Sequence, residues 1–188
     1  MIKFLNKNKD KPYIKFKETY EKAIFANQNI VEAISISSYS VSSNEVDSRF
    51  VNLKFVDNTD FIFFSNYLSP KASQFSSHDQ ISATIFWDSI NVQIRMKATI
   101  KRTTKDFNKQ YFYERSKKKN ALAISSNQSK VIRSYQEVKD NYYRTLQDDS
   151  LKECPDYWGG FSFTPYYFEF WTGHESRLNK REVYILND

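Results

Sequence analysis

The chain has 188 residues, with 28 Lys and Arg against 22 Asp and Glu, which gives a net charge of +6 at pH 7. Its composition, 40% hydrophobic and 27% charged, excludes a disordered chain. The single cysteine, Cys154, excludes an internal disulfide framework and a zinc site built on paired cysteines. No apolar run approaches the ~20 residues that span a bilayer, and the N-terminus lacks the features of a secretory signal. We therefore expect a cytoplasmic protein without membrane contact.

The length favours one domain, which we expect to span residues 1–188, with residues 1–11 as a flexible N-terminus. The positive charge is compatible with nucleic-acid binding, but anionic small molecules such as phosphates explain it equally well. We expect no nucleic-acid partner. The densest basic run, Lys117–Lys119, is interpreted as a solvated loop or helix face.

The first half of the chain predicts a helix, several short strands and a second, shorter helix. Apolar side chains recur at helical spacing between residues 11 and 27, where Pro12 suits the first turn. A serine N-cap followed by proline begins the second helix, residues 69–75. The strands, separated by a Ser-rich turn at residues 38–47 and an Asp-Asn-Thr turn, are expected at residues 30–37, 49–56 and 60–65.

The clearest strand is predicted from Val92 to Lys101, where apolar and polar residues alternate throughout. Residues 81–87 precede it as the other arm of a hairpin. The remaining predicted elements are helices at residues 104–115 and 131–142 and aromatic strands at residues 161–170 and 182–186. Many short strands with few helices favour an antiparallel barrel with helices packed outside it.

Several kinds of active site are excluded by the rarity of the residues that they need. Three glycines are too few for a glycine-rich dinucleotide loop or a P-loop. Two histidines and one cysteine cannot build a His-rich metal site, so we expect no metal. A Ser-His-Asp triad is formally possible, but no nucleophile-elbow motif supports it. Catalysis would therefore rely on a bound cofactor and on Arg, Lys, Tyr and amide side chains.

Four polar clusters lie in or beside the predicted strands, at residues 49–54, 69–71, 125–129 and 171–181. Each has an ordinary structural explanation by itself, as outward-facing strand residues or, for Trp171, as a core aromatic. Together they offer cations for phosphate, amides for the edge of a heterocycle, and an indole to pack against one.

Three motifs in the C-terminal third carry a family resemblance: Trp158-Gly-Gly-Phe161, Phe168-Glu-Phe-Trp171-Thr-Gly and Arg177-Leu-Asn-Lys-Arg181. They resemble the signature of the pyridoxamine 5'-phosphate oxidase family, and the resemblance continues upstream in the same order over roughly residues 12–188. It implies a mainly β fold with packed helices, an antiparallel FMN-binding split β-barrel. It also implies a homodimer that binds FMN at the subunit interface.

The resemblance implies a set of FMN contacts. Arg49 and Lys71 would contact the phosphate, whereas Trp171 and Arg181 would complete the flavin site from the opposite subunit. The full implied set is Arg49, Phe50, Val51, Asn52, Leu53, Lys54, Phe64, Ser65, Lys71, Gln93, Gln128, Ser129, Trp171 and Arg181.

The resemblance also implies a substrate site. Lys54, Tyr111 and Arg115 match the residues that bind the substrate phosphate, and Lys119 stands where the family has a serine for the same group. Arg177 matches the arginine placed over the substrate ring, so Arg177 and Asn179 are the catalytic candidates.

This chain departs from the family pattern at three further positions. Pro70 stands where the family commonly has a basic residue, and Asn179 and Lys180 replace a histidine and an aspartate. Asparagine can exchange hydrogen bonds but cannot carry a proton near neutral pH as histidine can. FMN binding is expected to survive these changes better than substrate turnover.

The leading hypothesis is an FMN-dependent oxidase that converts pyridoxamine or pyridoxine 5'-phosphate to pyridoxal 5'-phosphate with oxygen as acceptor. The flavin would supply the redox chemistry, which fits a chain without a conspicuous acid–base pair. The alternatives are a related flavin oxidoreductase with another substrate, such as a phenazine precursor, and a flavin-binding or nucleic-acid-binding protein without catalysis.

Overall fold

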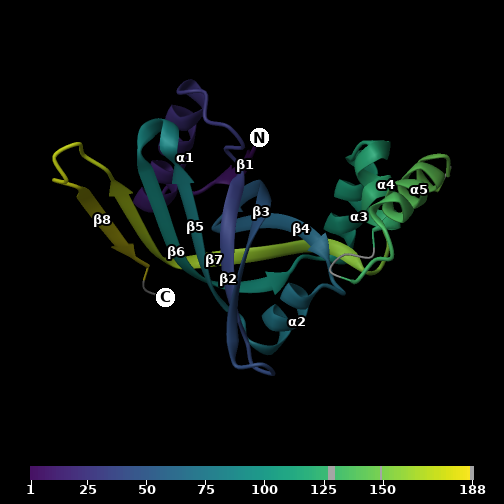
Figure 1. Ribbon diagram of the computed structural model, residues 1–188. Helices are drawn as coiled ribbons and strands as arrows, with labels where there is room; N and C mark the ends of the chain where they lie inside the picture. Colours follow the sequence, from purple (N-terminus) through teal and green to yellow (C-terminus); the bar gives the residue numbers. More distant parts are fainter. Residues whose placement is uncertain (127–129, 149, 187–188) are drawn as a thin grey trace. The chain divides into compact units, whose positions relative to one another are not determined.

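The computed structural model describes residues 1–126, 130–148 and 150–186 (Figure 1). It contains two compact units. One comprises Met1–Phe63, Gln74–Lys101 and Ser162–Asp188, and the other comprises Phe64–Ser73 and Arg102–Phe161. The expected organisation as one domain stays a prediction.

Eight strands form one sheet in the order β1-β3-β2-β5-β6-β7-β4, with β8 on β7 and a further pairing between β3 and β4. That further pairing links the two ends of the run from β3 to β4, as expected of a barrel. The strands are β1 (Lys3–Lys7), β2 (Ala33–Ser40), β3 (Glu45–Asn58), β4 (Asp60–Asn66), β5 (Gln80–Trp87), β6 (Val92–Arg102), β7 (Trp158–Thr172) and β8 (Lys180–Ile185). The pairs β2–β3, β2–β5, β3–β4, β5–β6 and β7–β8 are antiparallel, whereas β1 runs parallel to β3.

Five α-helices and one short 3-10 helix complete the described residues. They are α1 (Lys11–Phe25), α2 (Pro70–Ser77), η1 (Asp88–Ile90), α3 (Lys105–Glu114), α4 (Lys117–Ser125) and α5 (Tyr135–Leu146). Helix α1 buries Tyr13, Phe16 and Tyr20 at helical spacing, and the Phe16 ring packs edge-on against Phe61 of β4 at 4.9 Å between centroids. Burying a phenylalanine side chain contributes about 1.5–3 kcal/mol, so this face holds α1 on the sheet.

Most elements lie where the sequence predicted them, with differences at several boundaries. The Ser-rich turn is shorter than expected, because β2 continues to Ser40 and β3 already begins at Glu45. The buried Ser38 hydroxyl donates to Gln74, so a serine is accommodated inside a strand. Helix α5 begins at Tyr135 rather than near Val131, because the Ser134 hydroxyl caps it by accepting from the Glu137 N–H.

One segment adopts structure that the sequence did not predict, and a second decides between two interpretations. Residues 1–11 contain β1 and the first residue of α1, and the backbone N–H of the buried Ile2 donates to the Tyr20 hydroxyl at 2.8 Å. The lysine run 117–119 forms the first turn of α4, so the helix interpretation holds there rather than the loop.

Within the described ranges, no helix is long and apolar enough to cross a membrane. The same residues contain no group of His, Cys, Asp and Glu side chains that could hold a metal ion.

Candidate functional site

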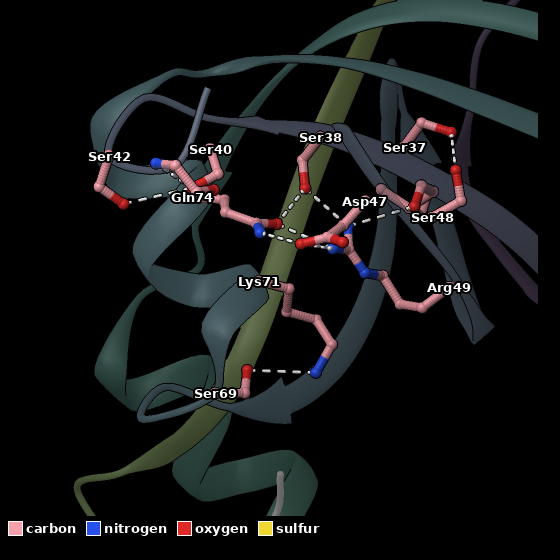
Figure 2. A network of polar contacts seen from close by, with 12 residues as sticks. Ser37, Ser38, Ser40, Ser42, Asp47, Ser48, Arg49, Ser69, Lys71 and Gln74 are labelled. Atoms are coloured by element: carbon pink, nitrogen blue, oxygen red, sulfur yellow. Dashed lines mark hydrogen bonds and ion pairs between the residues drawn. The ribbon is translucent and has the colours of Figure 1, made fainter. Parts of the chain in front are cut away.

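Hydrogen bonds from its guanidinium hold Arg49, the first residue of the strand cluster at residues 49–54, in place (Figure 2). Its Nη1 donates to the Ser38 hydroxyl at 2.6 Å and to the Ile36 carbonyl at 3.3 Å, both on the neighbouring strand β2. Its Nη2 donates to the side-chain oxygen of Gln74 in α2 at 2.8 Å. Five N–H donors in a planar fork suit phosphate, and these bonds hold the fork in one orientation.

The charge of Arg49 is only partly balanced by its neighbours. Burial lowers the pKa of the Arg49 guanidinium, and the Asp47 carboxylate opposes that change. The two charged groups lie 3.8 Å apart, longer than a hydrogen bond, and Asp47 remains 56% exposed. A second anion would therefore find a partly desolvated cation here.

The rest of this strand segment divides between two faces of β3. Phe50 is 76% exposed, whereas the Leu53 side chain lies in the core, so only the backbone of Leu53 can meet a ligand. Lys54 is half-buried and lies 4.0 Å from Glu32. Val51 and Asn52 pair with Ile34 and Ala33 of β2.

In the second unit, Lys71 carries a buried ammonium group. Its Nζ donates to the Ser65 hydroxyl at 3.0 Å and to the Ser69 hydroxyl at 3.1 Å. Ser69 precedes Pro70 at the start of α2, and Ser65 lies near the end of β4, so a turn and a strand end position the cation. The predicted contacts Ser65 and Lys71 therefore lie together.

An aromatic stack forms the other feature of the second unit. The Phe64 ring is stacked on Tyr111 of α3, with centroids 4.1 Å apart, and on Trp158 at 5.0 Å. The Arg115 guanidinium lies over the Trp158 ring, 4.5 Å from its centroid, and Nη2 donates to the Lys119 carbonyl at 3.2 Å. The predicted substrate residues Tyr111, Arg115 and Lys119 are therefore neighbours, although Lys119 contributes its backbone in this contact.

Arg115 combines burial with an unsatisfied donor. Its Nη1 is buried and has no hydrogen-bond partner among the residues that the structure describes. Burial lowers the pKa of Arg115, while Tyr111 and Cys154 oppose that change. Burial likewise raises the pKa of Tyr111, so its hydroxyl stays protonated and can donate a hydrogen bond at neutral pH. Arg115, Tyr111 and the stacked rings beside them can together bind an anion attached to a flat ring.

The end of the β7–β8 hairpin holds the predicted flavin contacts Trp171 and Arg181. Trp171 pairs with Arg181 across the two strands. The buried Glu169 carboxylate accepts from Arg95 Nη2 at 3.1 Å and lies 3.7 Å from Arg181 Nε. Glu169 therefore fixes Arg95 through a hydrogen bond and forms a looser ion pair with Arg181.

The loop between these strands carries both catalytic candidates. The Asn179 side-chain oxygen accepts from the His174 N–H at 3.0 Å, which ties the loop to itself. Arg177 is exposed and has a positive φ of 59°, a conformation that costs energy for a residue with a side chain. Among the other predicted contacts, Gln93 is half-buried and pairs with Phe86, and Gln128 and Ser129 lie outside the described residues.

Comparisons with known proteins point to one family over nearly the whole chain. Residues 158–188 match the model of the pyridoxine 5'-phosphate oxidase C-terminal dimerisation region. The pyridoxine/pyridoxamine 5'-phosphate oxidase of Rhodopirellula baltica is 32% identical over 187 residues, which cover 97% of this chain and 84% of that protein. The Pseudomonas fluorescens oxidase is 32% identical over 95% of this chain and 85% of its own length. The chain belongs to the pyridoxine/pyridoxamine 5'-phosphate oxidase family.

Relatives of other length and solved structures extend this result. The chain is 31% identical to the chloroplastic pyridoxine/pyridoxamine 5'-phosphate oxidase 1 of Arabidopsis thaliana over 94% of its residues, but covers only 34% of that longer protein. The crystal structure of PhzG from Burkholderia lata, in complex with tetrahydrophenazine-1-carboxylic acid, superimposes with a TM-score of 0.85 at 20% identity, covering 94% of this chain and 87% of that one. This likeness confirms the expected fold, a mainly β split barrel with packed helices.

Family motifs gave no role to the residues that hold the predicted contacts in place. Asp47 lies two positions before Arg49, so the period-two rule for strands puts both on one face of β3, a signal that was available. Glu169 stands in the motif Phe168-Glu-Phe-Trp171, but the motif did not indicate its contacts with Arg95 and Arg181. Gln74 gave no signal, because it meets Arg49 only through tertiary packing.

Proposed function

We propose that this chain is an FMN-dependent oxidase that converts pyridoxine or pyridoxamine 5'-phosphate to pyridoxal 5'-phosphate, with oxygen as the acceptor. The observation that carries the substrate part is Arg115, whose Nη1 is buried without a partner among the described residues beside the stacked rings of Tyr111 and Trp158. An unpaired buried donor is costly, and the phosphate of a pyridine vitamer would satisfy it.

The residues present fit FMN in their donor chemistry. Arg49 is a partly desolvated cation, and Lys71 is a buried ammonium held by two hydroxyls. Both suit a phosphate through charge-assisted hydrogen bonds, and Ser65 adds a hydroxyl beside Lys71. When bound, FMN supplies the flavin that accepts a hydride from the substrate. The chain itself binds the two phosphates and orients the substrate ring.

We propose that Arg177 lies against the substrate ring and that Asn179 fixes the loop carrying it. Asn179 holds the loop through its bond to the His174 N–H, which fits a positioning role. It cannot move a proton, so turnover should depend on orientation rather than on acid–base catalysis at this position.

A homodimer is part of the proposal. The matched dimerisation region covers β7 and β8, where Trp171 and Arg181 pair. Large apolar side chains also remain exposed on the sheet of the first unit, Phe50 at 76% and Phe86 at 54%. Burial of such groups is a common source of dimer stability.

The test is to mix the FMN-loaded protein with substrate in the absence of oxygen and to monitor the visible absorbance of the flavin. Pyridoxine 5'-phosphate or pyridoxamine 5'-phosphate should bleach the flavin, and readmitted oxygen should restore its colour. Unphosphorylated pyridoxine should reduce it far more slowly. If FMN binds but neither phosphorylated vitamer reduces it, the proposed oxidase activity is wrong. A flavin oxidoreductase with another substrate would then be the next hypothesis to test.

A further inference from the structure

The side-chain amide of Gln74 lies between a cation and an anion (Figure 2). Its Oε1 accepts from Arg49 Nη2 at 2.8 Å and from the Ser38 hydroxyl at 2.6 Å, and its Nε2 donates to the Asp47 carboxylate at 2.5 Å. Gln74 is only 6% exposed. A guanidinium can only donate and a carboxylate can only accept, so these neighbours determine which end of the amide faces which.

We propose that Gln74 is the positioning residue that keeps Arg49 ready for a phosphate, and that Asp47 sets how strongly the phosphate is held. The proposal rests on the function proposed above, in which Arg49 contacts the FMN phosphate. Gln74 does not touch the phosphate in this account. It acts through Arg49.

The neutrality of Gln74 is central to this role. Together with Ser38 and Ile36 it fixes the guanidinium in one orientation, but a neutral acceptor leaves the positive charge uncompensated. Gln74 also draws the Asp47 carboxylate to its own Nε2, and Asp47 stays 3.8 Å from Arg49 rather than forming a short bidentate pair. The charge of Arg49 therefore remains available to an incoming dianion.

Asp47 has the opposite effect on an incoming phosphate. Its carboxylate is the acidic group that lies within 4 Å of Arg49 among the described ion pairs, and it is half exposed. A phosphate bound to Arg49 would lie near this negative charge and be repelled by it. Asp47 thus lowers the affinity for the phosphorylated flavin and leaves the unphosphorylated one unaffected.

Three variants test the two roles against FMN and riboflavin, which differ in the phosphate alone. Gln74→Glu supplies Arg49 with an internal carboxylate and should weaken FMN binding at least about tenfold, with riboflavin changed less than about twofold. Gln74→Met keeps the size and neutrality but removes the hydrogen bonds, and should weaken FMN by a smaller factor. Asp47→Asn should tighten FMN severalfold without affecting riboflavin.

Glu45→Gln is the matched control for Asp47→Asn, because Glu45 is an exposed carboxylate on the same strand. It should leave both affinities unchanged. Circular dichroism and thermal melts of each variant separate folding from binding. Because Asp47 is exposed, Asp47→Asn should fold normally. Its FMN affinity can therefore be measured even if substitutions at the buried Gln74 impair folding.

The outcomes distinguish the two levels of the proposal. If the wild-type protein binds neither flavin at micromolar concentration, the proposed function fails. The inference is overturned if the wild type binds FMN but Gln74→Glu weakens FMN and riboflavin binding by the same factor. It is also overturned if Gln74→Glu changes neither affinity, and in both cases Gln74 has a structural role only. An Asp47→Asn variant with unchanged FMN affinity removes Asp47 from the phosphate environment.

Discussion

The charged guanidinium of Arg115 is partly buried. The guanidinium lies against the Trp158 indole, one nitrogen donates to the Lys119 carbonyl, and Nη1 has no partner among the described residues. A buried cation without its anion destabilises the fold. Such a group is therefore typical of a site where a ligand supplies the anion. Its planar shape matters as well, because a flat guanidinium stacks on an indole and a rounded ammonium does not.

Replacement of Arg115 should therefore distinguish substrates by their phosphate. In Arg115→Ala, we expect kcat/KM for pyridoxine 5'-phosphate to fall by about 10–100-fold, the effect of losing a charged hydrogen bond. Turnover of unphosphorylated pyridoxine should change much less, and steady-state kinetics on both substrates make the comparison. Lys109→Ala, which removes an exposed cation from α3, the helix that ends just before Arg115, is the control. Equal losses on both substrates would remove Arg115 from the phosphate site.

At this scale the sequence indicated candidate ligand contacts, which stay predictions, but not all of the residues that support them. Motifs indicated Arg49, Lys71 and Arg115, because such residues stand at fixed places in a family pattern. Gln74 stayed unrecognised, since it meets Arg49 only when α2 packs beside the β2–β3 hairpin and no local periodicity encodes that contact. The Asn179 substitution was visible, but its bond to the His174 N–H needed the structure.

Among the secondary-structure elements, local pattern decided which ones were predictable. Strand β6 alternates apolar and polar residues, so its boundaries were almost correct. Strand β1 is mostly exposed and gains its structure from a long-range parallel pairing with β3, which leaves no alternation to read. Helix α4 begins with three lysines, which oppose the helix dipole, and the buried Asn120 anchors it by donating to the Phe112 and Leu151 carbonyls.

The ion pairs of Glu182 give the attachment of β8 a dependence on pH. Glu182 accepts from Lys15 of α1 and from Lys180 of β8, and these hydrogen bonds lower the pKa of its carboxyl from the ordinary 4.5. A carboxyl whose pKa is lowered by folding contributes stability above its unfolded pKa and loses it as the pH falls through the folded pKa. The contribution should be complete at pH 7 and absent in strong acid.

Glu182→Gln should lower the free energy of unfolding by at most about 1 kcal/mol at pH 7, because the pair is partly exposed. The difference from the wild type should shrink as the pH falls below 4.5 and in high salt. Urea denaturation at pH 7 and in acid measures both effects. Glu175→Gln, in the exposed loop before β8, should leave stability unchanged. A loss that stays constant with pH would mean that packing, and not charge, makes the difference.

At the scale of the whole molecule, composition and family motifs together predicted the fold class. Many short strands with few helices indicated an antiparallel barrel, and the resemblance implied the split-barrel form of it. The sheet order itself was not readable, because β4 pairs with its neighbour β3 and also with β7, far along the chain. Pairings between distant strands leave no trace in local periodicity, which is why the order needed the structure.

The proposed division of the flavin site between subunits makes a prediction about assembly. If Trp171 and Arg181 reach the cofactor of the partner subunit, FMN binds the dimer better than the monomer. Thermodynamic linkage then requires FMN to strengthen the dimer by the same factor. Saturating riboflavin should strengthen it by a similar factor, because phosphate contacts within the flavin's own subunit contribute equally to binding by monomer and dimer.

Sedimentation velocity over a dilution series, with and without saturating FMN, measures this coupling. We expect a homodimer at micromolar concentration, with a dissociation constant about 5–150-fold lower in the presence of FMN, the usual range for coupled sites. Arg181→Ala should reduce that factor, since its guanidinium is 61% exposed and paired only loosely with Glu169 at 3.7 Å. Lys105→Ala removes a cation with 85% exposure and should leave the factor unchanged. An FMN-saturated monomer at these concentrations would contradict the shared site, because one chain would then hold the cofactor without its partner.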